Sequence, residues 1–207
     1  MSLPTLYLAR HGQDIDNASG ILNGRRDMPL TAIGVDQATQ LAHKIREAGI
    51  RFDRVYCSPL QRAHQTATIL TTALELDPPV KLDLLIERDF GVMSGKPAKE
   101  IENLCAPDIL KTDTITYFLS PDGAETFPEL LKRAGMLLGI LREGYKENNL
   151  LLVTHGDFGK MLYAAFYGLE WQEVLTLFHF GNSDLLLLAE GTEPEKRRIF
   201  GMQQFNQ

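Results

Sequence analysis

The amino-acid sequence predicts an α/β domain, a three-layer α/β/α sandwich whose central sheet is mostly parallel. Strand-like apolar runs alternate along the chain with segments of helical period, which is the pattern of such a fold. One run, Leu150–Val153, is continuously apolar, as a strand buried on both faces of a parallel sheet should be. Two of the runs end in the same way, one at His11-Gly12 and the other at His155-Gly156.

Length and charge limit what the chain can be. Its 207 residues fit one fairly large domain with its own hydrophobic core, and two full domains are not expected. Apolar residues make up 44% of the chain and charged residues 23%, which excludes the disordered, collagen-like and coiled-coil classes. With 21 Lys and Arg against 27 Asp and Glu, the net charge is −6, so no nucleic-acid partner is expected. An anionic ligand must therefore be held by a local cluster of cations.

The first part of the chain carries two helix patterns between strand patterns. Thr31 is a helix cap, and the apolar residues after it recur at intervals of three and four as far as Ala48. Ser58-Pro59 suits the first turn of a second helix, which we expect to run to about Leu76. The strands expected here are Leu6–Ala9, Val55–Cys57 and Val80–Leu85.

The second part contains the strongest helix pattern of the sequence, from Phe127 to Tyr145. Thr126 and Glu129 stand before it in capping-box spacing. A further helix is expected around Phe158–Tyr167. The strands expected in this part are Leu150–Val153, Leu185–Ala189 and Arg198–Phe205.

Residues 96–125 separate the two parts and carry only a weak pattern. Pro97, Pro107 and Pro121 interrupt it, among scattered polar residues. We interpret this stretch as a short helical insertion that covers a site, within one domain of residues 1–207.

The start of the chain, its longest apolar window and its cysteines carry no pattern of a targeting, membrane-spanning or metal-binding segment. The start has no basic region, and its apolar run Leu6–Ala9 ends after four residues, unlike a signal peptide. The longest nearly apolar window, Met161–Leu169, is less than half of a membrane span, so we expect a cytoplasmic protein without a membrane partner. The two cysteines, Cys57 and Cys105, lack the spacing of zinc ligands or of a disulfide framework. We expect both to be ordinary thiols.

The two His-Gly pairs are candidate functional residues. The carboxyl ends of parallel strands meet at one edge of a sheet, so His11 and His155 are expected to face one another across a small site. A single histidine more often satisfies hydrogen bonds in a core, but the repeated arrangement favours function here. His43, His64 and His179 stand in helical or irregular segments and are expected to be structural or exposed.

The residues around His11 resemble a known signature. Arg10-His11-Gly12-Gln13, with Asn17 following, is similar to the motif of the histidine phosphatase superfamily, also called the phosphoglycerate mutase-like family. The resemblance continues in family order from Leu6 to about Leu188. The other matching blocks are Gly24-x-x-Asp27-x-Pro29-Leu30-Thr31-x-x-Gly34-x-x-Gln37-Ala38, Cys57-Ser58-Pro59-Leu60-x-Arg62-Ala63-x-Gln65-Thr66-Ala67, Leu85-Ile86-Glu87-Arg88-Asp89-Phe90-Gly91, Val153-Thr154-His155-Gly156 and Asn182-Ser183.

The resemblance implies a nucleophilic histidine. A neutral imidazole attacks phosphorus through Nε2 when an acceptor, commonly a backbone carbonyl, holds the proton on Nδ1, and His11 is expected in this role. The guanidinium groups of Arg10 and Arg62 suit the equatorial phosphoryl oxygens, and His155 adds a further hydrogen bond. These cations should depress the pKa of His11 and keep it unprotonated near neutral pH.

A second implied role is that of acid and base. Glu87 occupies the position that protonates the leaving alcohol and then activates water in the mutases and many phosphatases that this chain resembles. The alternative is that Glu87 merely pairs with Arg88 or Arg10. Glu125 matches a family block as well as a helix cap, and we assign it no catalytic role.

Further residues are candidates for the substrate pocket. Asn17, Asn23, Gly24 and Gly156 match family blocks around the phosphate, although the asparagines and Gly24 suit loop turns equally well. Asp14 departs from the family pattern, which has small hydroxyl residues there. A carboxylate beside the pocket disfavours highly anionic substrates such as bisphosphorylated sugars. The cations that could extend the rim, each expected singly to be a solvated surface charge, are Arg25, Arg26, Lys96, Lys99 and Lys160.

These residues favour a metal-independent phosphomonoesterase that hydrolyses a small phosphorylated metabolite through phosphohistidine, with no cofactor. The alternative is a phosphoglycerate mutase. The mutases generally carry a longer insertion with extra arginines, whereas Lys96–Glu125 is short and has none. A non-catalytic phosphate-binding module is disfavoured by the intact set of Arg10, His11, Arg62, Glu87 and His155.

A metal-dependent aspartyl phosphatase was the remaining alternative. Asp14-x-Asp16 resembles its motif, but those carboxylates should directly follow the strand, and Arg10–Gln13 intervene. We therefore expect no metal site. The sequence leaves the natural substrate and the oligomeric state open.

Overall fold

The structure is a computed structural model, and it describes residues 4–145, 149–192, 198–201 and 204. Its centre is a six-stranded sheet in the order β3-β2-β6-β1-β7-β8. Neighbours β3, β2, β6 and β1 run parallel, whereas β7 is antiparallel to β1 and β8 to β7. The strands are β1 (Thr5–Arg10), β2 (Arg54–Cys57), β3 (Val80–Lys81), β6 (Asn149–Thr154), β7 (Leu185–Leu188) and β8 (Arg198–Phe200).

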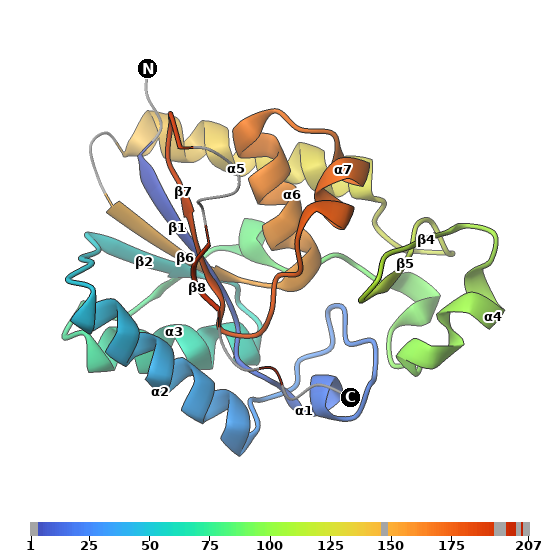
Figure 1. Ribbon diagram of the computed structural model, residues 1–207, viewed down its shortest axis with the longest axis horizontal. Helices are drawn as coiled ribbons and strands as arrows, with labels where there is room; N and C mark the ends of the chain where they lie inside the picture. Colours follow the sequence, from blue (N-terminus) through green and yellow to red (C-terminus); the bar gives the residue numbers. More distant parts are fainter. Residues whose placement is uncertain (1–3, 146–148, 193–197, 202–203, 205–207) are drawn as a thin grey trace.

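Helices cover both faces of this sheet, which confirms the predicted three-layer α/β fold (Figure 1). One face carries α2 (Ala32–Glu47) and α3 (Gln61–Ala73). The other carries α5 (Phe127–Gly144), α6 (Gly156–Tyr167) and α7 (Trp171–Leu177). Because side chains alternate along a strand, Leu8 of β1 joins the core under α5 and α6, and Ala9 joins the core under α2 and α3.

The helix starts that the sequence indicated are formed. Thr31 caps α2, since its Oγ1 accepts a hydrogen bond from the Gly34 amide at 3.1 Å. Thr126 and Glu129 form the expected capping box of α5, in which the Glu129 carboxylate accepts from the Thr126 amide at 2.9 Å. Local side-chain chemistry therefore places both helices.

The second helix starts later than expected. Ser58-Pro59 does not form its first turn, because α3 begins at Gln61 and Leu60 is still extended, with ψ 139°. The Ser58 amide instead donates to the Val153 carbonyl at 3.0 Å, so the chain continues in sheet-like pairing past β2. This keeps Ser58 at the end of the sheet, beside His155.

The expected strand Val80–Leu85 is mostly wrong. Only Val80–Lys81 pairs with β2, and Asp83–Leu85 forms a 3-10 turn. β3 is an edge strand with a single neighbour, and the last bond of this pairing runs from the Leu82 amide to the Cys57 carbonyl, 2.9 Å away. The turn then buries Leu85 completely and carries the chain toward Glu87.

The insertion at residues 96–125 is helical only in its first part. A 3-10 turn, Ala98–Glu100, leads into α4 (Ile101–Cys105), and a hairpin of β4 (Ile109–Lys111) and β5 (Thr116–Phe118) follows. β-branched residues are frequent in this part, and they favour strands. The Oγ1 of Thr112 also closes the turn by accepting from the Ile115 amide at 3.0 Å. The hairpin and α4 lie to one side of the sheet, next to the loop that contains the short helix α1, Ile15–Ala18 (Figure 1).

Two short helical elements lie outside the layers. α1 (Ile15–Ala18) follows β1, and a 3-10 turn spans Gly91–Met93. Of the predicted strand Arg198–Phe205, residues Arg198–Phe200 form β8, while 202–203 and 205 lie outside the described residues. In the part of the chain that the structure describes, none of the helices combines the length and the apolar character needed to cross a bilayer.

Candidate active site

Parallel pairing of β1 with β6 brings the two predicted histidines together. Arg10 and Thr154 are partners in register at the ends of β1 and β6, and His11 and His155 directly follow them in the chain. The His11 amide extends the ladder by donating to the Thr154 carbonyl at 3.0 Å. The two imidazole rings lie with their centroids 5.0 Å apart.

Hydrogen bonds fix the orientation of the His11 ring. Nδ1 lies 2.7 Å from the Gly12 carbonyl oxygen, which can only accept, so Nδ1 carries the proton. Nε2 lies 3.2 Å from Nε of Arg62, which can only donate. The lone pair of His11 is therefore on Nε2, as a nucleophile requires.

A close backbone contact holds the loop that carries His11. A Cβ added to Gly12 would lie 2.3 Å from the Gly34 carbonyl oxygen, and one added to Gly34 would lie 2.1 Å from that of Gln13. Both positions thus need glycine, because the loop presses against the first turn of α2. The Gly12 amide also donates to Thr66 Oγ1 at 3.0 Å, which ties the loop to α3.

Both histidines are almost fully buried, with His11 2% exposed and His155 0%. Burial is the largest cause that lowers the pKa of each ring well below its ordinary value, and the positive charges of Arg62 and Arg10 lower it further. The direction for His11 is the expected one, although burial contributes more than the cations do. Both rings are neutral near pH 7.

His155 has one engaged and one unengaged nitrogen. Its Nε2 lies 2.7 Å from the Oγ of Ser58, a partner that the sequence reasoning did not identify. Its Nδ1 is buried and has no hydrogen-bond partner among the residues described. Ser58 stands in a block that matches the family motif, but no sequence pattern indicates that its hydroxyl would meet this ring.

Arg62 is completely buried and held from three sides. Besides His11, it donates through Nη1 to the Arg26 carbonyl and through Nη2 to the Gly24 carbonyl, each at 2.7 Å. Gly24 therefore contributes its carbonyl to the guanidinium, and it adopts the positive φ of 51° that glycine tolerates best.

Arg10 lies on the other side of His11. Its Nη1 donates to the Phe180 carbonyl at 2.7 Å, and its Nε is buried without a partner in the described part of the chain. A Cβ on Gly156 would lie 3.7 Å from the Arg10 guanidinium carbon, so the two residues border the same space. Arg10 and His155 thus present two buried nitrogens that an oxyanion could engage.

Glu87 is buried, and its carboxylate lies against the first turn of α6, the helix that follows His155. Its Oε1 accepts from the amides of Arg88 and Phe158 at 2.8 and 3.0 Å, and its Oε2 accepts from that of Asp157 at 3.3 Å. Burial, followed by the negative charge of Asp157, raises the pKa of Glu87, and these amide bonds oppose the rise. The raised pKa favours a carboxyl that can give and take a proton.

The alternative role for Glu87, an ion pair with Arg88 or Arg10, is not formed between these described residues. Arg88 pairs with Asp157 instead, at 2.8 Å between Nε and Oδ2. Arg133, which the sequence reasoning missed, clamps the Glu87 segment. Its guanidinium donates to the carbonyls of Leu84 and Ile86 at 2.8 Å and to that of Glu87 at 3.3 Å.

Glu125 supports this clamp and does not face the histidines. Its Oε1 lies 2.9 Å from Nε of Arg133, and its Oε2 lies 3.1 Å from Nη2 of Arg25. Arg133 stands within the pattern of an amphipathic helix, where a single arginine is indistinguishable from a surface charge.

Asp14 does not border the pocket as expected. It is completely buried on the Nδ1 side of His11, with Oδ2 3.7 Å from that nitrogen and 3.6 Å from Nε of Arg62. The Nδ2 of Asn23 donates to the same oxygen at 2.8 Å, and the Asn17 amide donates to Oδ1 at 3.0 Å. Asp14 thus contacts His11 and Arg62 and is not among the described residues that line the cavity, contrary to its expected place beside the pocket.

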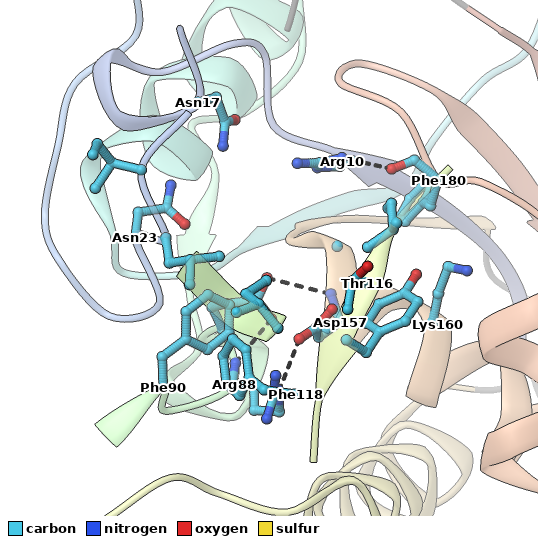
Figure 2. Close-up of a pocket in the computed structure, with 17 residues that line it drawn as sticks. Arg10, Asn17, Asn23, Arg88, Phe90, Thr116, Phe118, Asp157, Lys160 and Phe180 are labelled. Atoms are coloured by element: carbon cyan, nitrogen blue, oxygen red, sulfur yellow. Dashed lines mark hydrogen bonds and ion pairs between the residues drawn. The ribbon is translucent and has the colours of Figure 1, made fainter. Parts of the chain in front are cut away.

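A cavity of about 170 Å³ opens next to these residues (Figure 2). Of the predicted site residues, those that line it are Arg10, Asn17, Asn23, Glu87 and Gly156. His11, Arg62, His155 and Gly24 are not among the described residues that line it. His11 therefore lies outside the lining of this cavity, but close enough to Arg10, which does line it, for that charge to lower the pKa of the ring.

The chain belongs to the histidine phosphatase superfamily. The sequence model for branch 1 of this superfamily matches residues 6–197. A curated relative, the 2,3-bisphosphoglycerate-dependent phosphoglycerate mutase of Bartonella tribocorum, is 30% identical over 176 residues, which cover 83% of this chain and 85% of the relative. The corresponding protein of Methylobacterium sp. is 28% identical over 82% of this chain and 83% of its own.

Solved structures share the fold. A mycobacterial glucosyl-3-phosphoglycerate phosphatase superposes with a TM-score of 0.76 at 24% identity, covering 89% of this chain and 92% of that one. A phosphoserine phosphatase of Entamoeba histolytica in complex with 3-phosphoglyceric acid gives 0.72 at 24% identity, covering 89% and 90%. These similarities support the phosphoglycerate mutase-like architecture.

The buried environment predicts how the histidines titrate. We expect the His11 and His155 rings to remain neutral at pH 6, because burial and the two arginines lower both pKa values. Two-dimensional ¹⁵N NMR of the imidazole nitrogens measures this directly. The same chain unfolded in urea serves as the reference, and its histidines should titrate with midpoints at about pH 6.5. A midpoint near 6.5 for His11 in the folded protein would contradict the geometry.

Proposed function

We propose that the protein is a metal-independent phosphomonoesterase that works through a phosphohistidine on His11. The observation that carries this proposal is the pairing of the two ring nitrogens. Nδ1 is held by the Gly12 carbonyl at 2.7 Å, and Nε2 is left as the acceptor of the Arg62 Nε–H at 3.2 Å. A neutral, oriented imidazole beside guanidinium groups is suited to attack on phosphorus.

The first step forms the bond between Nε2 and phosphorus and breaks the ester P–O bond. When the phosphoryl group takes the Nε2 lone pair, the Arg62 Nε–H loses its acceptor and can turn to a phosphoryl oxygen. Arg10 and His155 supply further donors for the charge that spreads over the equatorial oxygens. The leaving alkoxide takes its proton from the Glu87 carboxyl group.

The second step reverses these roles. The Glu87 carboxylate removes a proton from water, the oxygen attacks phosphorus, and the P–N bond breaks to return neutral His11 and inorganic phosphate. One carboxyl group serves both steps because it is left deprotonated by the first. The raised pKa of Glu87 supports this exchange.

A phosphoglycerate mutase is the second candidate, and the names of the curated relatives favour it. Those relatives align with this chain over similar shares of both lengths, so overall length does not separate the two activities. The family resemblance implies extra arginines in the insertion of the mutases, and residues 96–125 of this chain contain none, which supports hydrolysis. We therefore keep hydrolysis as the proposed function.

The first prediction concerns the nucleophile. His11→Ala should abolish both turnover of 4-nitrophenyl phosphate and the acid-labile phosphoenzyme seen on rapid quenching, because no other described nitrogen is placed alike. His43→Ala, which removes an exposed histidine of α2, is the matched control and should leave both unchanged. Turnover by His11→Ala near the parental rate would overturn the assignment.

The second prediction concerns Glu87. Glu87→Gln cannot donate a proton, so phosphoenzyme formation from an alkyl phosphate should slow by ~10²–10⁴-fold. Formation from 4-nitrophenyl phosphate should change far less, since nitrophenolate leaves without protonation. Single-turnover quench experiments with both esters measure the difference. Equal losses for the two esters would show that Glu87 is not the acid.

A third prediction tests whether the activity requires a metal ion, and it separates hydrolysis from mutase activity. With excess EDTA, phosphate release should keep its full rate, because guanidinium groups carry the charge stabilisation. Exchange between 2- and 3-phosphoglycerate, primed with bisphosphoglycerate, should be at least ~10-fold slower than phosphate release from the best ester found. Activity that EDTA removes and magnesium restores, or exchange that outpaces hydrolysis, would contradict the proposal.

A further inference from the structure

We propose that the ester hydrolysed at this site carries an uncharged, mainly apolar alcohol, and that a second anionic group on the substrate is selected against. This inference rests on the proposed function and adds the chemical class of the substrate. It follows from the walls of the cavity on the side away from Arg10.

The cavity has a polar end and an apolar end. Arg10, Glu87 and Gly156 form the polar end, next to the buried histidines. Phe180 also lies near this end, because its carbonyl accepts from Arg10. The rest of the wall comes from the loop that contains α1, the Phe90 segment, α4 and β5. Its apolar side chains are Ile21, Leu22, Phe90, Ile101 and Ile115, and its uncharged polar ones are Asn17, Asn23, Thr116 and Tyr117.

The charged groups at the apolar end already have partners, and Arg88 is one of them. Arg88 is 1% exposed, and its Nε lies 2.8 Å from Oδ2 of Asp157. Its guanidinium carbon also lies 4.9 Å from the ring centroid of Phe90 and 4.3 Å from that of Phe118. Figure 2 shows Arg88 and Asp157 joined by this ion pair, with Phe90 and Phe118 labelled beside the arginine. Arg88 is therefore committed to Asp157.

Lys160 is bound by backbone carbonyls and not by a carboxylate. Its ammonium donates to three backbone carbonyls around the end of α7, at 3.4 Å to Val174, at 2.9 Å to Leu175, and to Phe178. Three carbonyl partners use all three of its N–H bonds. Burial lowers the pKa of Lys160 to about 8. In Figure 2 its amino end is turned away from Arg10 and Asn17.

The remaining candidate rim cations do not reach the cavity. Arg25 pairs with Asp89 and Glu125, and Arg26 pairs with Asp16 at 2.8 Å. Within the described residues, neither these arginines nor Lys96 and Lys99 line the cavity.

A second anion at this end of the cavity would thus meet mainly apolar side chains and two cations, Arg88 and Lys160, that already have partners. A carboxylate moved there would lose its hydration without gaining a cation that lacks a partner, which is unfavourable. An alkyl or aryl group would gain from burial of its apolar surface. A second space of about 610 Å³ borders the same segments and gives room for a longer alcohol. Ile101 and Ile115 line both spaces, as do Arg10 and Asn17.

A matched pair of substrates tests the proposal. Hexyl phosphate and the same ester with a carboxylate at the far end of the chain have leaving alkoxides of nearly equal basicity. We expect kcat/KM to be higher for hexyl phosphate by ~10-fold or more, because only the carboxylate must be desolvated. Equal values, or a preference for the carboxylate, would overturn the proposal.

A charge placed in the wall tests the cause. Thr116 of β5 lines both hollows, and Thr116→Lys should narrow the preference for hexyl phosphate by ~10-fold through attraction of the carboxylate. Thr68→Lys adds the same charge on the exposed side of α3 and should leave the preference unchanged. An unchanged preference in Thr116→Lys, or an equal shift in both variants, would assign the selection to something other than this wall.

Acid-quench measurement of the phosphoenzyme distinguishes the two levels of the account. If both esters form it at equal kcat/KM, the substrate inference fails while the phosphohistidine proposal stands. If neither ester forms it but 4-nitrophenyl phosphate does, only the substrate inference fails. If none of the three esters forms it and none is hydrolysed, both proposals fail. Formation from hexyl phosphate at the higher kcat/KM supports both.

Discussion

The hydrogen bond between His11 Nδ1 and the Gly12 carbonyl oxygen, 2.7 Å long, is the contact on which the site depends. It puts the proton on one ring nitrogen and leaves the lone pair on the other, where Arg62 meets it. The loop can make this bond because Gly12 and Gly34 let two backbones touch. The in-register pairing of β1 with β6 then brings the second imidazole alongside.

Burial and charge act on the groups of the site in opposite senses. Removal from water lowers the pKa of His11 and raises that of Glu87, so both groups are neutral over a wider pH range than they would be in solution. A neutral nucleophile and a protonated acid are the forms that the first chemical step needs. Two further residues hold this arrangement and do not line the cavity among the described residues. Buried Asp14 contacts His11, and half-buried Arg133 donates to the Glu87 carbonyl.

Sequence patterns predicted the parts of the fold that local chemistry decides. The caps at Thr31 and Thr126, the alternating elements and the paired histidines follow from short-range signals. The turn after Lys81 was missed because the length of the edge strand β3 depends on its pairing with β2, more than 20 residues earlier in the chain. The hairpin in the insertion is local, but its two strands have only three residues each, too few for a clear alternating pattern. Arg133 and Ser58 were missed because their partners in the site are distant in sequence: the carbonyls that Arg133 binds are 46 or more residues away, and His155 is 97 residues from Ser58. The buried place of Asp14 was missed because it depends on Arg62, which is 48 residues further along the chain.

The central claim is that Nε2 of His11 is the atom that meets phosphorus, with the two arginines and His155 around it. A crystal structure of the protein with orthovanadate, an analogue of the phosphoryl transition state, tests it most directly. We expect vanadium bonded to Nε2, with its equatorial oxygens hydrogen-bonded to Arg10 and Arg62 and one oxygen near His155. Vanadate bound elsewhere in the cavity, with Arg62 still donating to Nε2, would contradict the account.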